Sequence, residues 1–467
     1  MFSKEVYTQR REILREKLSS GIVLLPGNPD SPMNAPANTF HFRQDSSFLY
    51  YFGLDFPNII GIIDIDNQKD HLFASDVDLD DIIWMGPQES IKETGAKVGV
   101  DHTAPFDKAY DFLAEAIKKG RAIHFLPQYR AENVILLEKL LGIHPSKTAA
   151  YVSEELIKAV VAQRSIKDHH EIEELDRAAN IGYQMHTTAM RMAKPGVYER
   201  EIAGKIEGIA ISYGGMLSFP VILTINGQTL HNHYHGNLMK EGDLMLTDAG
   251  AETDTHYASD FTRTVPVGGK FTPEQKDVYQ IVMHANNRAF KNIKPGAYYK
   301  DIHLLAAKTI AEGLKELGIM KGNVEDAVQQ GAHAMFMPHG LGHMMGLDVH
   351  DMEAIGEDYV GYDDEVKRSD IFGLAGLRLG RKLQPNFVLT NEPGIYFIPE
   401  LIDRWKADKK FTEFINYDKL EGYKDFGGIR LEDDILITSD GCRLLGDKRL
   451  PITPDDIENE MQKDIEF

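Results

Sequence analysis

Three histidines lie within a glycine-rich stretch of the C-terminal half of the chain. They are His339, His343 and His350, and glycine occupies positions 340, 342 and 346 among them. Histidine is a common metal ligand and a proton carrier near neutral pH, and glycine allows close backbone approach. One such histidine would favour an ordinary surface loop. Three of them, followed by acidic residues inside apolar runs, favour a functional site.

Four acidic residues occur within or at the ends of runs that read as strands. They are Asp248, Asp260, Glu392 and Glu432. A hairpin would bring the first two together, and period-2 alternation around the last would place Arg430, Glu432 and Asp434 on one face. An acid among apolar residues is unfavourable unless it is paired or bound to a metal. Each acid alone could be a solvated strand-end carboxylate, but the four together are better explained by bound cations.

The four carboxylates and the imidazole of His343 form a set of hard oxygen donors with one nitrogen donor. Such a set is too acidic for a single structural zinc ion. It suits two divalent ions, with Mn²⁺ as the first choice and Co²⁺, Fe²⁺ or Zn²⁺ as alternatives. A pair of metal ions generates a nucleophilic hydroxide and polarises the bond to be broken.

The elements that must position these residues occur twice along the chain. A Lys-Pro-Gly turn opens a helix at residue 194 and again at residue 294. Each copy leads to a histidine-bearing segment and then to a strand with a turn, three apolar residues, a threonine and an acid, at 241–248 and at 384–392. Two repeats are too few for a solenoid. We therefore expect a domain with pseudo-twofold halves and a site between them.

Bulk properties restrict the organisation of the protein. The 467 residues suffice for two or three domains with sizeable cores. Strands alternate with helices before the duplicated region, which predicts an N-terminal α/β domain over residues 1–163 and a catalytic domain over residues 164–467. The predicted fold class is thus α/β, or α+β.

Charge and cysteine content restrict the partners and the location. A formal net charge of −21 argues against nucleic acid or an anionic membrane as the main partner. Cys442 is the single cysteine, so there is no internal disulfide and no thiolate metal cluster. The N-terminus does not open a signal peptide, and no apolar run is long enough to span a bilayer. These observations predict a cytoplasmic protein.

Several motifs resemble those of the pita-bread metallopeptidases, which include methionine aminopeptidase, aminopeptidase P, prolidase and creatinase. The stretches 339–350, 390–396 and 430–433 are similar to the proline-specific branch. The stretch 43–52 and the pair Ile83-Trp84 resemble the aminopeptidase P amino-terminal domain, which methionine aminopeptidase lacks. The resemblance implies an N-terminal α/β domain followed by a pita-bread domain with pseudo-twofold halves.

The resemblance also implies roles for individual residues. Two metal ions would be bound by Asp248, Asp260, His343, Glu392 and Glu432. Glu392 would accept the proton of the nucleophilic water. His231 would contact the substrate or the tetrahedral intermediate, His350 would hold the substrate carbonyl, and His339 would assist nearby.

Four further residues are assigned to substrate binding by the same resemblance. They are Trp84, Arg378, Tyr396 and Arg430. Trp84 can come from a neighbouring subunit in this family, which implies a homodimer or homotetramer. Arg378 matches a position at which prolidases hold the carboxylate of a dipeptide.

The implied activity is that of an Xaa-Pro aminopeptidase, which releases the first residue from peptides with proline in second position. The bond before proline is a tertiary amide without N–H, so an enzyme cannot bind it through that group. The metal ions would bind its carbonyl oxygen. Prolidase (Xaa-Pro dipeptidase) is the alternative, because 336–339, 392–398 and 426–428 resemble it. Creatinase-type hydrolysis of a small amide and a metal-free pita-bread binding protein are other possibilities. All five ligand positions, however, carry ligand-type side chains.

Overall fold

The computed structural model describes residues 1–464 and consists of two compact units. Of the described residues, the first unit contains 1–164 together with 352–359, and the second contains 165–351 and 360–464. The assignment of domains to 1–163 and 164–467 stays a prediction. Within the described residues, no helix is both long and apolar enough to cross a membrane.

The first unit is built on a five-stranded sheet of order β6-β5-β4-β1-β7. Its strands are β1 (Ile22–Pro26), β4 (Ile60–Asp64), β5 (Lys69–Phe73), β6 (His102–Ala104) and β7 (Ile123–His124), and β2 (Pro32–Ala35) and β3 (Asn38–Thr39) form a separate hairpin. Its helices are α1 (Lys4–Lys17), α2 (Ser46–Phe52), α3 (Leu79–Met85), α4 (Ile91–Lys97), α5 (Lys108–Lys118), α6 (Ala131–Leu141), η1 (Pro145–Ala150) and α7 (Glu154–Arg164). Strands β1 and β4 are wholly buried, as their apolar sequences require. None of the side chains of α3 is buried, and Trp84 on it is 85% exposed.

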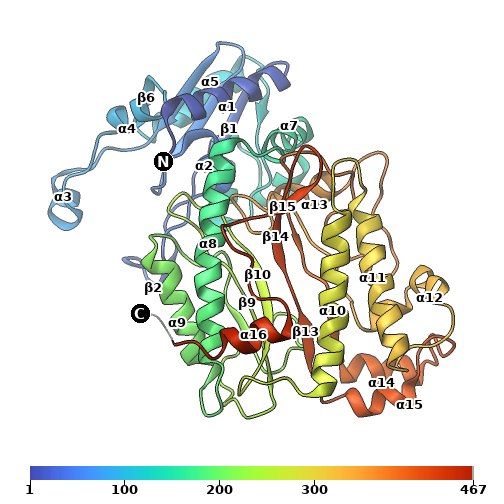
Figure 1. The fold of residues 1–467 in the computed structure, drawn as a ribbon. Coiled ribbons are helices and arrows are strands. Elements are labelled where there is room, and N and C mark those ends of the chain that lie inside the picture. The colour runs from blue at the N-terminus through green and yellow to red at the C-terminus, as the bar shows by residue number, and fades with distance from the viewer. Residues whose placement is uncertain (465–467) are drawn as a thin grey trace. The chain divides into compact units, whose positions relative to one another are not determined.

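The second unit places short antiparallel strands between pairs of helices. Its strands are β8 (Ile222–Thr224), β9 (Leu244–Ala249), β10 (Phe261–Pro266), β11 (Val388–Asn391), β12 (Gly394–Tyr396), β13 (Gly428–Arg430), β14 (Asp433–Ile437) and β15 (Cys442–Leu444). Its main helices are α8 (His169–Met192), α9 (Glu199–Ser212), α10 (Pro273–Asn292) and α11 (Tyr299–Glu316). In Figure 1, α8 and α9 lie on one side of these strands and α10 and α11 on the other.

Shorter helices complete the chain. They are α12 (Val324–Gln330), η2 (Ala332–Met335), α13 (Glu353–Gly361), α14 (Pro399–Ala407), α15 (Tyr417–Leu420), η3 (Glu421–Tyr423) and α16 (Pro454–Glu460). Each of the two longest helices begins with a capping box. Asp168 and Glu171 form a capping box at α8, and Thr272 and Gln275 form one at α10, where Pro273 takes the first helical position. In each box two otherwise unpaired backbone N–H groups are satisfied.

The two halves of the second unit repeat one another in detail. Gly196 and Gly296 both have positive φ, of 86° and 82°, and each is the glycine of a Lys-Pro-Gly turn. The N–H of Gly196 donates to the carbonyl of Met239, and the N–H of Gly296 donates to that of Leu383, both over 2.9 Å. Three residues after these acceptors, Gly242 and Asn386 also have positive φ. The same turn thus leads into β9 in one half and into β11 in the other, as the sequence repeat predicts.

Candidate active site with a metal-ligand set

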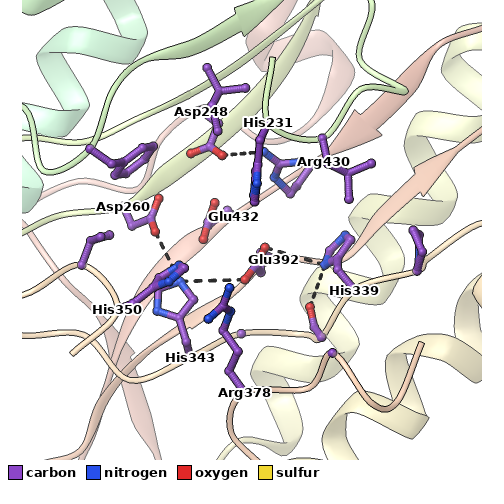
Figure 2. Close-up of a pocket in the computed structure, with 18 of the residues that line it drawn as sticks. His231, Asp248, Asp260, His339, His343, His350, Arg378, Glu392, Arg430 and Glu432 are labelled. Carbon is purple, nitrogen blue, oxygen red and sulfur yellow. Dashed lines mark hydrogen bonds and ion pairs between the residues drawn. The ribbon is translucent and has the colours of Figure 1, made fainter. Parts of the chain in front are cut away.

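A cavity of about 470 Å³ in the second unit gathers most of the predicted site residues (Figure 2). Those that line it are His231, Asp248, Asp260, His339, His343, His350, Arg378, Glu392, Arg430 and Glu432. Tyr396 does not line the cavity but is hydrogen-bonded to two residues that do. Trp84 belongs to the first unit, so its predicted role in substrate binding stays a prediction.

Antiparallel pairing explains why the acidic residues meet. Asp248 lies in β9 opposite Thr262 of β10, and Asp260 directly precedes β10. Glu392 directly follows β11, and Glu432 lies in the gap between β13 and β14. The backbone N–H of Glu432 donates to the carbonyl of Thr262 over 3.0 Å. This bridge brings the strands of the two halves together at the cavity.

Three of these residues come close enough to share one cation. Asp260, His343 and Glu432 each offer a ligand atom, and these atoms lie within 4.8 Å of one another. The Nε2 atom of His343 is 3.4 Å from an oxygen of Asp260 and 3.9 Å from one of Glu392. The Nδ1 atom of His343 lies 3.0 Å from the carbonyl of Met344, so it carries the proton. Nε2 is therefore left free as a donor to a metal.

The electrostatics of the cavity favour a bound cation. Burial, followed by repulsion from Asp248, raises the pKa of Asp260 well above its ordinary value. Burial, followed by repulsion from Asp260, does the same to the pKa of Glu432, and burial raises the pKa of Glu392. In the described part of the chain, Oδ1 of Asp248 and Oδ1 of Asp260 are buried without a hydrogen-bond partner. Such unsatisfied, mutually repelling oxygen donors fit divalent cations.

One buried cation of the protein itself offsets part of this negative charge. The guanidinium of Arg430 donates to Asp248, to the Tyr396 hydroxyl over 2.8 Å and to the Thr262 hydroxyl over 3.0 Å. Arg430 is 3% exposed, so these contacts replace its lost hydration. Its charge also acts to lower the pKa of Asp260, Glu392 and Glu432, but burial outweighs this effect in all three.

His339 is held as a neutral imidazole at the edge of the acidic group. Burial, followed by the charge of Arg430, lowers its pKa to about 3. Its Nδ1 lies 2.7 Å from the carbonyl of Gly340, and its Nε2 lies 3.0 Å from the Tyr396 hydroxyl. Nδ1–H therefore donates to Gly340, and Nε2 accepts from Tyr396. Nδ1 is also 3.8 Å from Glu392, which places a second imidazole beside that carboxylate.

The remaining histidines lie around the same space. The ring centres of His343 and His350 are 4.1 Å apart. Partial burial, followed by the charge of Arg430, lowers the pKa of His231. Apolar residues also line the cavity, namely Phe219, Pro220, Ile222, Leu230 and Val349. The cavity therefore offers a substrate both polar groups and apolar surface.

The structure adds residues that the sequence interpretation did not assign. The Thr262 hydroxyl donates to Glu432 over 2.7 Å, and Asp434 accepts the backbone N–H of Asp260 over 3.0 Å. Asp434 does not line the cavity with Arg430 and Glu432 as the alternation predicts, and the stretch is divided into β13 and β14. The alternation of Asp260, Thr262 and Thr264 could have indicated Thr262 as a neighbour of the site.

Comparison with known proteins places this geometry in a family. Residues 173–439 match the model of metallopeptidase family M24, and residues 7–124 match that of the aminopeptidase P N-terminal domain. The human Xaa-Pro dipeptidase is 32% identical over 465 residues, covering 94% of this chain and 88% of that protein. A probable Xaa-Pro aminopeptidase of Sordaria macrospora is 31% identical over 461 residues, covering 97% and 94%.

Solved structures agree with this result. Pseudomonas aeruginosa aminopeptidase PepP matches with a TM-score of 0.81 at 28% identity, over 98% of each chain. Zn-substituted Escherichia coli aminopeptidase P in complex with product matches with a TM-score of 0.79 at 28% identity, also over 98% of each chain. The chain belongs to metallopeptidase family M24. Within that family it has the architecture of aminopeptidase P, with the matching N-terminal domain followed by the pita-bread domain.

Proposed function

We propose that the protein is a metal-dependent Xaa-Pro aminopeptidase, which releases the N-terminal residue from peptides with proline in second position. The observation that carries the proposal is the convergence of Asp260, His343 and Glu432 within one buried cavity. Asp248 and Glu392 line the same cavity. Similarity over nearly the whole chain to proteins named aminopeptidase P supports the substrate class.

Two divalent ions would be held by Asp248, Asp260, His343, Glu392 and Glu432. When bound, these ions would activate water and polarise the scissile carbonyl. Mn²⁺ is our choice because the set contains four carboxylates and one imidazole. Co²⁺, Fe²⁺ and Zn²⁺ are alternatives, and the solved structure of a zinc-substituted relative supports keeping zinc among them.

The chain's own residues would move the protons and orient the substrate. Glu392 would take a proton from the attacking water. It would then give this proton to the prolyl nitrogen, which has no hydrogen of its own in the peptide bond and must be protonated to leave. His350 and His231 would donate to the substrate carbonyl and to the oxyanion that develops on it. His339 is neutral and hydrogen-bonded to Tyr396, and it would hold its imidazole ring next to Glu392.

A metal titration combined with a peptide assay tests this assignment. Metal-free protein should not cleave Ala-Pro-Ala, and added Mn²⁺ should restore release of alanine. Elemental analysis should find about two metal ions in each active chain. Absence of bound metal together with absence of cleavage after metal addition would overturn the proposal and favour a binding protein.

Dipeptidase activity is the second candidate, and one observation favours it. Arg378 lines the same cavity as the candidate ligands, where a guanidinium could hold the carboxylate of an Xaa-Pro dipeptide. The relatives also include proteins named Xaa-Pro dipeptidase. Comparison of Ala-Pro with Ala-Pro-Ala separates the two activities. Cleavage of the dipeptide alone would establish the dipeptidase and refute the aminopeptidase.

The assembly and location of the protein are part of the same proposal. Trp84 is 85% exposed, and exposed apolar residues on α3 favour contact with another copy of the chain. We therefore propose a homodimer or homotetramer in which Trp84 contributes to substrate binding. The cytoplasm is the proposed location. Light scattering of the wild-type protein and of Trp84→Ala measures the oligomeric state.

A further inference from the structure

The strand pairing in the second unit is interrupted at the two glutamates of the candidate site. The pairing of β11 with β14 ends at Asn391 and Asp433, and that of β12 with β13 begins again at Gly394 and Arg430. Glu392 and Glu432 lie in the gap. Pro393 follows Glu392 and has no N–H to donate. The backbone next to both glutamates therefore needs support from outside the sheet.

A buried amide from α10 spans this gap. The Nδ2 group of Asn286 donates to the carbonyl of Asn391 and to the carbonyl of Leu431, each over 3.2 Å. These two residues directly precede Glu392 and Glu432. Both protons of the amide are thus used, one for each strand. Asn286 is completely buried, so water does not compete for these bonds.

The orientation of the Asn286 amide is fixed from its other end. Arg449 donates from Nη2 to Oδ1 of Asn286 over 2.8 Å and also to Asp433 over 2.8 Å. A guanidinium can only donate and a carbonyl oxygen can only accept, so the amide cannot be reversed without losing all three contacts. Asn391 returns a separate hydrogen bond from its own side chain to the carbonyl of Asn286, over 3.1 Å.

We infer that Asn286 is a positioning residue, which sets the separation of Glu392 and Glu432 and thereby prepares them to bind metal together. The inference rests on the proposed metal-binding role of the two glutamates. Asn286 does not line the cavity and acts through the backbone at Asn391 and Leu431. Residues that orient metal ligands in this way typically change metal affinity or activity by about 10–100-fold when replaced.

The test is calorimetric titration of the metal-free, folded protein with Mn²⁺. Asn286→Leu has a similar volume but lacks both donors, and we expect it to weaken Mn²⁺ binding about 10–100-fold. At saturating metal, kcat for Ala-Pro-Ala should fall while KM changes little, because the groups that contact substrate remain. Circular dichroism and the melting temperature establish that the variant is folded.

Asn391→Val is the matched control. It removes only the returned hydrogen bond and leaves both Asn286 donors and both acceptor carbonyls in place. We expect Mn²⁺ affinity within about threefold of wild type. If Asn391→Val weakens binding as much as Asn286→Leu does, the effect belongs to packing in general and the inference is overturned.

A second variant at the same position keeps the inference testable if Asn286→Leu does not fold. Asn286→Ser keeps a single hydroxyl donor, and we expect an intermediate loss of Mn²⁺ affinity. Unchanged affinity in either folded Asn286 variant contradicts the inference. If the wild type binds Mn²⁺ but does not cleave Ala-Pro-Ala, the proposed peptidase function fails while the titration still tests Asn286.

Discussion

Arg430 is hydrogen-bonded through its guanidinium to the carboxylate of Asp248, inside a cavity where the other candidate metal ligands are mostly acidic. It is a permanent positive charge of the protein at a site that is proposed to receive two divalent cations. Arg430 forms a direct ion pair with Asp248. Its charge also favours the ionised forms of Asp260, Glu392 and Glu432, but burial and mutual repulsion still raise the pKa of Asp260 and Glu432 well above the ordinary value.

This relationship predicts a metal-dependent stability effect for Arg430→Met. Loss of one partner of a buried ion pair typically costs about 3–5 kcal/mol. We expect a cost of that order in the metal-free protein and a smaller one with saturating Mn²⁺, because bound cations relieve the same repulsion. Calorimetric unfolding with and without metal measures the difference. Equal losses in both states would contradict the electrostatic explanation.

Replacement of Glu392 by Gln is expected to separate catalysis from folding. The substitution preserves the shape of the side chain but removes the proposed proton acceptor, and general acid–base groups typically contribute about 10²–10⁴-fold. We expect a loss of Ala-Pro-Ala hydrolysis of at least about 10²-fold with an unchanged circular dichroism spectrum. His343→Ala should abolish hydrolysis through loss of metal. Glu400→Gln, on α14 and outside the cavity, is the control and should be fully active.

Two buried histidines that do not line the cavity predict a pH dependence of stability. His303 and His333 are completely buried, with ring centres 6.1 Å apart. Burial, followed by the neighbouring His333 and His339, lowers the pKa of His303 to about 3, and burial lowers that of His333 to about 4. An unfolded histidine titrates near 6.5. Below that pH the two histidines bind protons in the unfolded chain but not in the folded chain. Their contribution to the free energy of unfolding is therefore complete above pH 6.5 and is lost as the pH falls towards 4.

The double variant His303→Gln/His333→Gln should reduce this slope. Each histidine contributes roughly 1.4 kcal/mol for each pH unit well below 6.5. Denaturant unfolding of the metal-free protein between pH 7 and pH 4.5 measures the slope of the unfolding free energy against pH. Subtracting the wild-type slope from that of the variant removes the contribution of the other titrating groups. His284→Gln changes an exposed histidine and should leave the slope unaltered. An unchanged slope in the double variant would refute the prediction.

A buried ion pair next to the cavity residue His350 predicts a large loss of stability when it is broken. Lys167 contacts Asp351 over 2.8 Å, and both side chains are 1% exposed. Lys167→Met should therefore cost about 3–5 kcal/mol. Arg404→Met breaks an exposed pair of the same length with Asp408 and should cost at most about 1 kcal/mol. Similar losses of unfolding free energy in the two variants would show that burial does not make the Lys167–Asp351 pair more important for stability.

The sequence predicts the candidate metal ligands better than it predicts the residues that hold those ligands in position. Asp248 and Glu392 are indicated because both end strands of one repeated design, and His343 is indicated by its glycine-rich setting. The bond of Asn286 to Leu431 joins positions 145 residues apart, and a single asparagine in a helix carries no local signal of such a contact. The alternation from Gly427 to Ile437 also predicts one strand, whereas the structure interrupts it at Leu431 and Glu432 because the pairing changes partners there.

The bridge between Thr262 and Glu432 has a consequence for how the protein is made. It joins residues 170 positions apart, so the acidic cavity closes only after nearly all of the second unit has been synthesised and packed. Contacts of such long sequence separation form late in folding because loop closure is costly. No fragment that ends before Glu432 contains the complete ligand set. Tight uptake of metal would thus report that an individual molecule has finished folding.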